Sequence, residues 1–167
     1  MKIESIKTIE VMGIKWTVLD KTEKGYLAIG DSIGRKVFGR NNDWKESDIR
    51  KFLNTEVLER LEKELNIQLP EFERNLLSLD GQTEYGTCMD KVSMITVDEY
   101  RKYRSKLPNT GEWWWTITPD STPYNDDETW IAVVSSSGFI VYDYYSRSNG
   151  VRPICIFPFS IFEFEEK

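Results

Sequence analysis

Residues 129–145 read TWIAVVSSSGFIVYDYY, and this stretch decides the fold. Two runs rich in β-branched and aromatic residues, 130–134 and 139–145, flank the short polar segment 135–138. Runs of this composition that are separated by a glycine-containing turn are typical of a β-hairpin. The sequence therefore predicts an antiparallel hairpin in the last third of the chain.

Alternation of apolar and polar residues extends this prediction to both ends of the chain. Ile14, Trp16 and Val18 alternate with polar residues, and the segment 26–31 (YLAIGD) is suited to be the hairpin partner of that strand. Near the C-terminus, ICIF at 154–157 places its two isoleucines on one face and Cys and Phe on the other, and Pro158 should end this strand or put it at an edge. Asn-Gly at 149–150 suits a tight turn.

Helices are expected in the middle of the chain. Ser47 is a suitable N-cap for a helix whose apolar stripe recurs every three to four residues, and Asn54 and Thr55 are expected to break it into a short helix followed by a longer one. Thr96 with Glu99 forms the pattern of a capping box, which predicts the start of a second helix.

These elements indicate an α+β fold in a single compact domain, with antiparallel sheets and two main helices. The expected domain spans residues 1–167 and contains an N-terminal hairpin (3–30), a helical segment (44–66), a strand followed by a helix (91–105) and C-terminal antiparallel strands (113–160).

Composition and charge exclude several classes of function. The chain has 167 residues, a net charge of −6 and no long run of Lys or Arg, so we expect no nucleic-acid partner. It contains no histidine, which removes Ser-His-Asp and Cys-His catalysis and nearly all zinc hydrolase chemistry. Cys88 and Cys155 stand far apart and in no metal-ligand spacing. We therefore expect a protein that is not an enzyme and that uses neither metal nor cofactor.

The sequence also indicates where in the cell the protein is expected. The first residues lack the apolar core of a signal peptide, and no stretch approaches the roughly 20 apolar residues of a membrane span. With both cysteines interpreted as reduced thiols, we expect a cytoplasmic protein without a membrane partner.

Several motifs occur in an order that resembles a known family. WKESDIRKFLN, DKVSMITVDEY, WWWTITP, IAVVSSSGF and NGVRP follow one another between Trp16 and Phe157. This set is similar to a family of uncharacterised bacterial and prophage domains with a W-W-x-R-[ST]-P block and a closing G-V-R-P-A segment. The chain departs from that pattern at Ile117, where the family has arginine, and at 154–155, where Ile-Cys replaces Ala-Leu.

A second resemblance is architectural. A Trp-rich strand, a variable loop region and a closing G-x-R strand resemble the C-type-lectin-like fold, which also occurs in formylglycine-generating enzymes and in the variable proteins of diversity-generating retroelements. In that last group, the residues before the closing strand contact the ligand. The resemblance implies ligand contacts at Tyr142, Tyr144, Tyr145, Arg147 and Asn149. It also implies that Arg152 is a structural arginine, and the two cysteines do not reproduce the close pair of the enzymes.

Two other segments have alternative interpretations. Three consecutive tryptophans, Trp113, Trp114 and Trp115, must point to opposite faces of a strand, with Trp114 opposite the other two. We expect core packing there, and a sugar-stacking platform is the alternative. The acidic segment 125–128 carries hard oxygen ligands suited to calcium, but its spacing matches no calcium motif, and we interpret it as a solvated turn.

The hypothesis from sequence is a non-enzymatic binding protein. Its Tyr- and Arg-rich C-terminal surface would contact a protein, or alternatively a glycan, since Tyr, Arg and Asn are frequent in binding surfaces. The prophage resemblance implies inhibition of a host defence or regulatory protein. The alternatives are a carboxylate-dependent hydrolase or transferase, and a structural subunit of a larger assembly.

Overall fold

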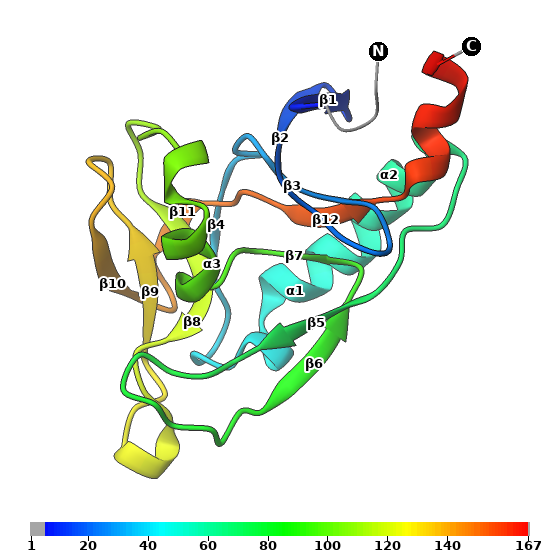
Figure 1. Ribbon diagram of the computed structural model, residues 1–167. Helices are drawn as coiled ribbons and strands as arrows, with labels where there is room; N and C mark the ends of the chain where they lie inside the picture. Colours follow the sequence, from blue (N-terminus) through cyan, green and yellow to red (C-terminus); the bar gives the residue numbers. More distant parts are fainter. Residues whose placement is uncertain (1–5, 167) are drawn as a thin grey trace.

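The computed structural model describes residues 6–166, with side chains described as far as Phe162. The strands in this range are β1 (Thr8–Val11), β2 (Ile14–Lys21), β3 (Tyr26–Gly30), β4 (Arg35–Val37), β5 (Phe72–Asn75), β6 (Thr87–Asp90), β7 (Val92–Ser93), β8 (Trp114–Pro119), β9 (Trp130–Val134), β10 (Ile140–Tyr144), β11 (Ser148–Gly150) and β12 (Ile154–Phe157). The α-helices are α1 (Asp48–Phe52), α2 (Leu58–Leu65) and α3 (Val97–Lys102), and short 3₁₀ turns begin at Trp44, Arg104, Pro123 and Phe159. The chain forms an α+β domain (Figure 1).

The strands form two sheets and a ribbon. The first sheet has the order β1-β2-β3-β12-β7, the second has the order β10-β9-β8-β11-β4, and β5 pairs with β6 alone. Pairing is antiparallel except where β11 runs parallel to β8. The ribbon of β5 and β6 lies in a segment that the alternation of residues did not predict.

The hairpin of β2 and β3 confirms the expected opening of the chain. Its turn depends on Gly25, whose φ of 150° lies in a region that residues with a side chain rarely adopt. A Cβ atom there would overlap the backbone of Phe157 in β12. Glycine is therefore required for the close approach of the final strand to this turn.

The helical segment expected at 44–66 forms one continuous helix. Ser47 caps it as predicted, because its side chain accepts a hydrogen bond from the Arg50 N–H. The prediction that Asn54 and Thr55 break the helix was wrong: α1 continues through a π-helical segment, Leu53–Val57, directly into α2. The helix ends at Asn66, which adopts the left-handed conformation typical of a C-terminal cap.

The second expected helix is shorter than predicted. The capping box of Thr96 and Glu99 is confirmed, with both reciprocal hydrogen bonds present. However, α3 has only 6 residues before a 3₁₀ turn takes over. The described chain therefore has one main helix and not two.

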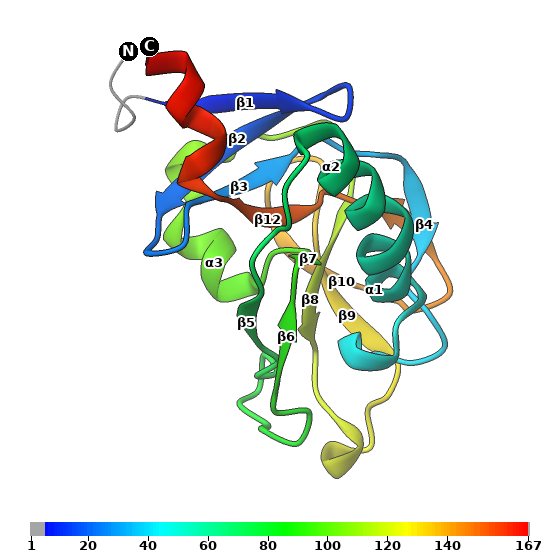
Figure 2. The same cartoon turned by 90° about the vertical axis from the view of Figure 1, so that its right-hand side faces the viewer.

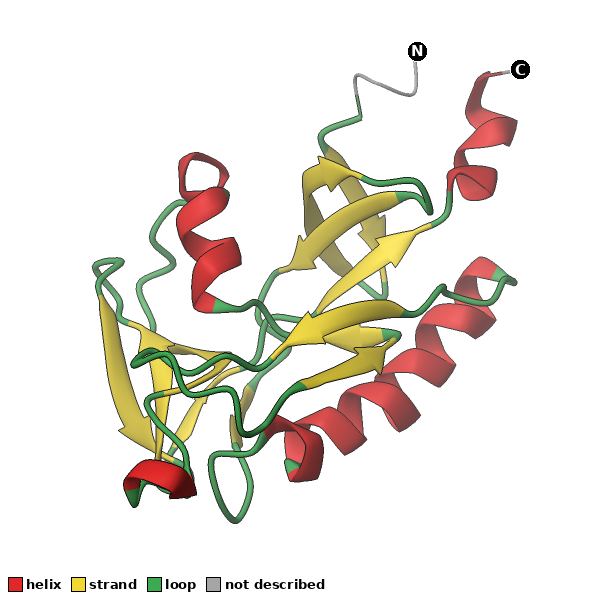
Figure 3. Cartoon of the chain, turned by 60° about the horizontal axis from the view of Figure 1, so that its bottom comes forward, coloured by secondary structure: helices red, strands yellow, loops and turns green. Residues whose placement is uncertain are grey.

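The first sheet lies between two helical layers, as Figures 2 and 3 show. On β12, Cys155 and Phe157 point into the core shared with the long helix, and Ile154 and Ile156 point into the core shared with α3. The predicted alternation is confirmed, and the strand ends before Pro158. β12 is not an edge strand, because it pairs with both β3 and β7.

The hairpin of β9 and β10 is confirmed, with register Tyr142↔Ala132. In contrast, the predicted tight turn at Asn149 and Gly150 was wrong, since both residues belong to β11 and pair with β4. The strand order places β10 at one edge of the second sheet, and Figure 1 shows it at the outer edge of the molecule.

Candidate functional site

Three aromatic side chains form a row on one face of the β9–β10 hairpin. Tyr142 and Tyr144 lie on the same face of β10, and Tyr144 is paired with Trp130 of β9. The Trp130 ring makes edge contacts with both, at centroid distances of 5.3 Å to Tyr142 and 5.6 Å to Tyr144. Tyr142 is 59 % exposed and Trp130 is 37 % exposed. We call these three residues the aromatic row, and it offers solvent a contiguous aromatic surface.

Tyr145 lies beside the aromatic row and is partly buried. It packs against the main core cluster, and its carbonyl accepts hydrogen bonds from the Phe38 and Gly39 N–H groups. The hydroxyl groups of Tyr145 and Tyr144 lie 3.2 Å apart and share a hydrogen bond, which raises the pKa of Tyr145. Tyr145 therefore orients Tyr144 more than it offers a surface of its own.

The outer edge of β10 has unpaired backbone groups. The Tyr145 N–H donates to the Thr129 carbonyl at 3.2 Å, which sets the phase of the antiparallel ladder. Alternate residues of such a ladder direct both backbone groups to the neighbouring strand, and the residues between them direct theirs away. The residues that face outward are therefore Ile140, Tyr142 and Tyr144.

One end of this edge is closed by the chain itself. The Asp143 Oδ1 atom accepts from the Tyr144 N–H at 2.8 Å, and the Arg147 N–H donates to the Tyr144 carbonyl at 2.9 Å. Among the described residues, this leaves the outward N–H and C=O groups of Ile140 and Tyr142 without a partner. The open edge thus coincides with the exposed part of the aromatic row.

The other two predicted site residues lie away from the aromatic row. Asn149 is buried, and its Nδ2 atom donates to Asp143 Oδ2 at 3.0 Å. Arg147 is exposed at the turn after β10. Both line a cavity of about 550 Å³ to which Asp143 also belongs, together with Arg35, Gly111, Glu112, Trp113, Ser136 and Ser148. The structure thus divides the predicted site into an aromatic surface and a separate polar concavity.

Trp130 belongs to the surface but was not among the predicted site residues. In the structure Ser135 pairs with Phe139, so the hairpin is centred on Ser137 and residue 130 lies opposite residue 144. Counting the register outward from the predicted turn, 135–138, would have placed residue 130 opposite residue 143, on the other face of the hairpin.

The neighbouring tryptophans follow the predicted alternation. Trp114 packs in the core under α3, and Trp115 packs in the core against the long helix. Trp113 is 40 % exposed and lines the polar concavity. Arg152 is 5 % exposed, donates from Nε to the Gly30 carbonyl at 3.1 Å and lies over the Trp114 ring, which is a structural position.

Carboxylates surround the Trp130 end of the aromatic row. Asp127 Oδ1 accepts from the N–H groups of Thr129 at 2.9 Å and Trp130 at 3.2 Å, and Glu128 is exposed beside them. Burial and then the charge of Asp127 raise the pKa of Asp120. In the described residues, no group of three or more His, Cys, Asp or Glu side chains is arranged to hold a metal ion.

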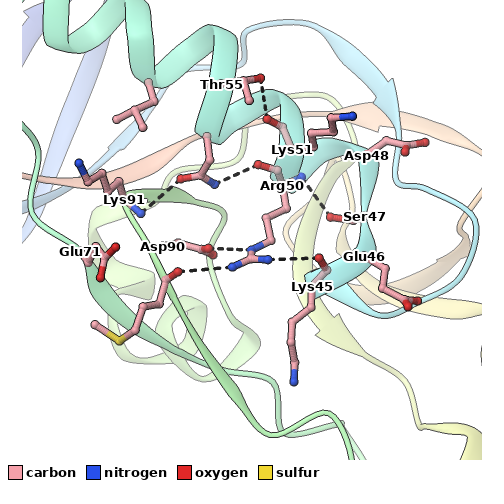
Figure 4. Close-up of a pocket in the computed structure, with 13 residues that line it drawn as sticks. Lys45, Glu46, Ser47, Asp48, Arg50, Lys51, Thr55, Glu71, Asp90 and Lys91 are labelled. Atoms are coloured by element: carbon pink, nitrogen blue, oxygen red, sulfur yellow. Dashed lines mark hydrogen bonds and ion pairs between the residues drawn. The ribbon is translucent and has the colours of Figure 1, made fainter.

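A second cavity, of about 550 Å³, lies between the long helix and β6 (Figure 4). At its base, Asp90 is buried and accepts hydrogen bonds from Arg50 Nε and Trp44 Nε1, both at 2.7 Å. Cations and carboxylates occur there in equal number, so the cavity has no marked charge preference; they are Lys45, Arg50, Lys51 and Lys91 against Glu46, Asp48, Glu71 and Asp90. We interpret this arrangement as a structural ion-pair network.

Cys88 lies near that network. Burial, and then the Asp90 charge, raise the pKa of its thiol to about 11. Burial alone raises the pKa of the Cys155 thiol. Neither environment favours a reactive thiolate.

No protein-family model, no curated protein and no solved structure matches this chain. Within the described residues, no helix is both long and apolar enough to cross a membrane.

Proposed function

We propose that this protein is a non-enzymatic binding protein that recognises a protein partner through the open edge of β10 and the aromatic row. The observation that supports the proposal is the coincidence of these two features. Tyr142 is 59 % exposed, and its backbone N–H and C=O lack a partner among the described residues at the same edge. An exposed edge strand promotes aggregation unless it is covered, so natural proteins rarely leave an apolar one open without a use.

The proposal includes the scaffold and the biological role. We propose a C-type-lectin-like scaffold, which the buried position of Arg152 before β12 supports. We also propose that the partner is a host defence or regulatory protein, which binding inhibits by covering its surface. This last part rests on the resemblance to prophage domains alone.

The acidic residues give little support to a hydrolase. Asp80 and Asp120 have pKa values displaced in opposite directions: hydrogen bonds from Ser121 and Ser78 lower that of Asp80, and burial raises that of Asp120. However, Asp80 is exposed, and its hydrogen bonds tie two loops together. A pair of this kind lacks the enclosed site in which acid and base catalysis requires its groups to be held.

The test is an affinity capture from bacterial lysate with three forms of the protein. The wild type is compared with the double variant Trp130→Ala/Tyr142→Ala, and with Tyr124→Ala as the matched control. Tyr124 is 81 % exposed and lies outside the aromatic row, so it controls for the loss of an exposed aromatic ring. Circular dichroism first establishes that all three are folded.

We expect a protein that the wild type and Tyr124→Ala retain and the double variant loses. Capture of the same proteins by all three forms, or of none by any, would contradict the proposed surface. Mass spectrometry of the retained protein then tests whether it belongs to defence or regulation.

A further inference from the structure

Between Phe139 and Tyr142, the described residues leave the outer edge of β10 unprotected. Natural edge strands are commonly shielded by proline, by lysine or by a bulge. The residues along this edge are Phe139, Ile140, Val141 and Tyr142, none of which is such a device, and Phe139 is 70 % exposed. Two contacts close the edge beyond this stretch: the Tyr144 N–H donates to the Asp143 carboxylate, and the Arg147 N–H donates to the Tyr144 carbonyl. Among the described residues, the outward backbone donors and acceptors of Ile140 and Tyr142 therefore remain available to another strand.

The two faces of this edge differ in chemistry. The aromatic row occupies one face, and Phe139 and Val141 occupy the other, since alternate residues of a strand point to opposite faces. A strand added beside β10 would therefore place one set of its side chains against Tyr142 and the other set against Phe139 and Val141.

Charge favours a basic occupant on the aromatic face. Aromatic faces attract Lys and Arg side chains through the negative potential of the ring. Asp120, Asp127 and Glu128 add negative charge near Trp130, and the repulsion between Asp120 and Asp127 contributes to the raised pKa of Asp120. The whole chain carries a net charge of −6, which reinforces this local field.

We propose that the occupant of the β10 edge is an extended basic segment of the partner protein, added as a further strand, with Lys or Arg over the aromatic row and apolar residues over Phe139 and Val141. This inference rests on the proposed function and names the chemistry of its partner. The two outward residues, Ile140 and Tyr142, supply two N–H donors and two carbonyl acceptors for the added strand.

A second copy of this chain fits the edge poorly. Each copy carries a net charge of −6, and like charges oppose association. A basic segment instead has the charge opposite to that of the carboxylates near Trp130.

The probes are three capped pentapeptides: Lys-Val-Lys-Val-Lys, Ser-Val-Ser-Val-Ser and Glu-Val-Glu-Val-Glu. Each is titrated into ¹⁵N-labelled protein and followed by the backbone amide and indole resonances. We expect saturable shifts with the lysine peptide, centred on Ile140–Tyr142 and the Trp130 indole, and weakened as salt is raised. The glutamate peptide should cause no shifts at these positions.

Two variants distinguish the contribution of the β10 backbone edge to binding from that of the Tyr142 ring. Tyr142→Pro removes an outward N–H group and leaves the ladder to β9 intact, so it should abolish the shifts at Ile140 and Val141. Tyr142→Thr keeps the edge and removes the ring, and it should weaken binding of the lysine peptide by about five-fold. Tyr124→Thr should bind as the wild type does. The amide spectrum of each variant alone verifies its fold.

Equal shifts with all three peptides, or no saturable shift with the lysine peptide, would overturn the inference. So would a stable dimer in multi-angle light scattering that Tyr142→Pro dissociates, because the occupant would then be a second copy. If the lysate capture still depends on Trp130 and Tyr142 in such a case, the proposed function stands and only the chemistry of the partner is wrong.

Discussion

Replacing Asn54 by alanine should be one of the most costly single changes in the helical layer. The side chain of Asn54 projects from the π-helical segment toward β7. Its Nδ2 atom donates to the Val92 carbonyl at 2.7 Å and its Oδ1 atom accepts from the Val92 N–H at 3.0 Å. The same side chain also accepts from the Lys91 N–H at 3.3 Å and donates to the Arg50 carbonyl at 3.0 Å. Asn54 thus occupies the edge of β7 as another strand would.

The magnitude follows from what the change leaves without a partner. Val92 is 0 % exposed, so its N–H and C=O groups would lose the partner that Asn54 gives them in a buried setting. A buried group without a partner costs about 1–3 kcal/mol. The cavity of Figure 4, which Asn54 lines, gives water some access and favours the lower part of that range. We expect the free energy of unfolding to fall by about 2–4 kcal/mol, and the melting temperature by about 5–15 °C.

Urea unfolding followed by tryptophan fluorescence and circular dichroism measures this loss. Thr55→Ala is the matched control, because Thr55 is exposed and its Oγ1 atom donates to the Lys51 carbonyl within the same helix. Its loss should change the free energy of unfolding by less than about 0.5 kcal/mol. If Asn54→Ala proves no more destabilising than Thr55→Ala, the account of Asn54 as the partner of β7 is refuted.

Two further predictions concern titratable groups. Burial alone would raise the pKa of Glu99, but the hydrogen bonds and charge of Arg74 hold it below the usual 4.5. The ionised Glu99 therefore stabilises the folded protein fully above pH 4.5, and this stabilisation is lost as the pH falls through the lower pKa of the folded state. In a plot of the free energy of unfolding against pH, Glu99→Gln should make the decrease at acid pH less steep. The pKa of Cys88, raised from 9.0 to about 11, leaves about a hundred-fold less thiolate near neutral pH. The higher nucleophilicity of a thiolate of raised pKa offsets part of this deficit. Cys88 should therefore react with a thiol reagent about ten-fold more slowly in the folded protein than in urea, and an equal rate would contradict this.

The local pattern of residues in the sequence was sufficient to predict several helix starts and strand faces. Ser47 and the pair of Thr96 and Glu99 marked helix starts correctly, because a cap is a contact between residues three apart in the chain. The alternation in β12 assigned each face correctly, because the period of two is a property of the strand itself. The sequence also determined the acidic net charge and the absence of histidine chemistry.

Contacts between distant segments decided the rest. Asn54 was expected to break the helix because Asn favours local hydrogen bonds, but β7 supplies backbone partners that hold it within a π-helical segment. Asn149 was expected in a tight turn, but pairing with β4 draws it into a strand. Only the tertiary structure places β10 at a sheet edge, since the order of strands depends on pairings between residues far apart in the chain. The aromatic residues of the candidate site were visible in the sequence. The unpaired backbone groups beside them, among the described residues, follow from the order of strands in the second sheet.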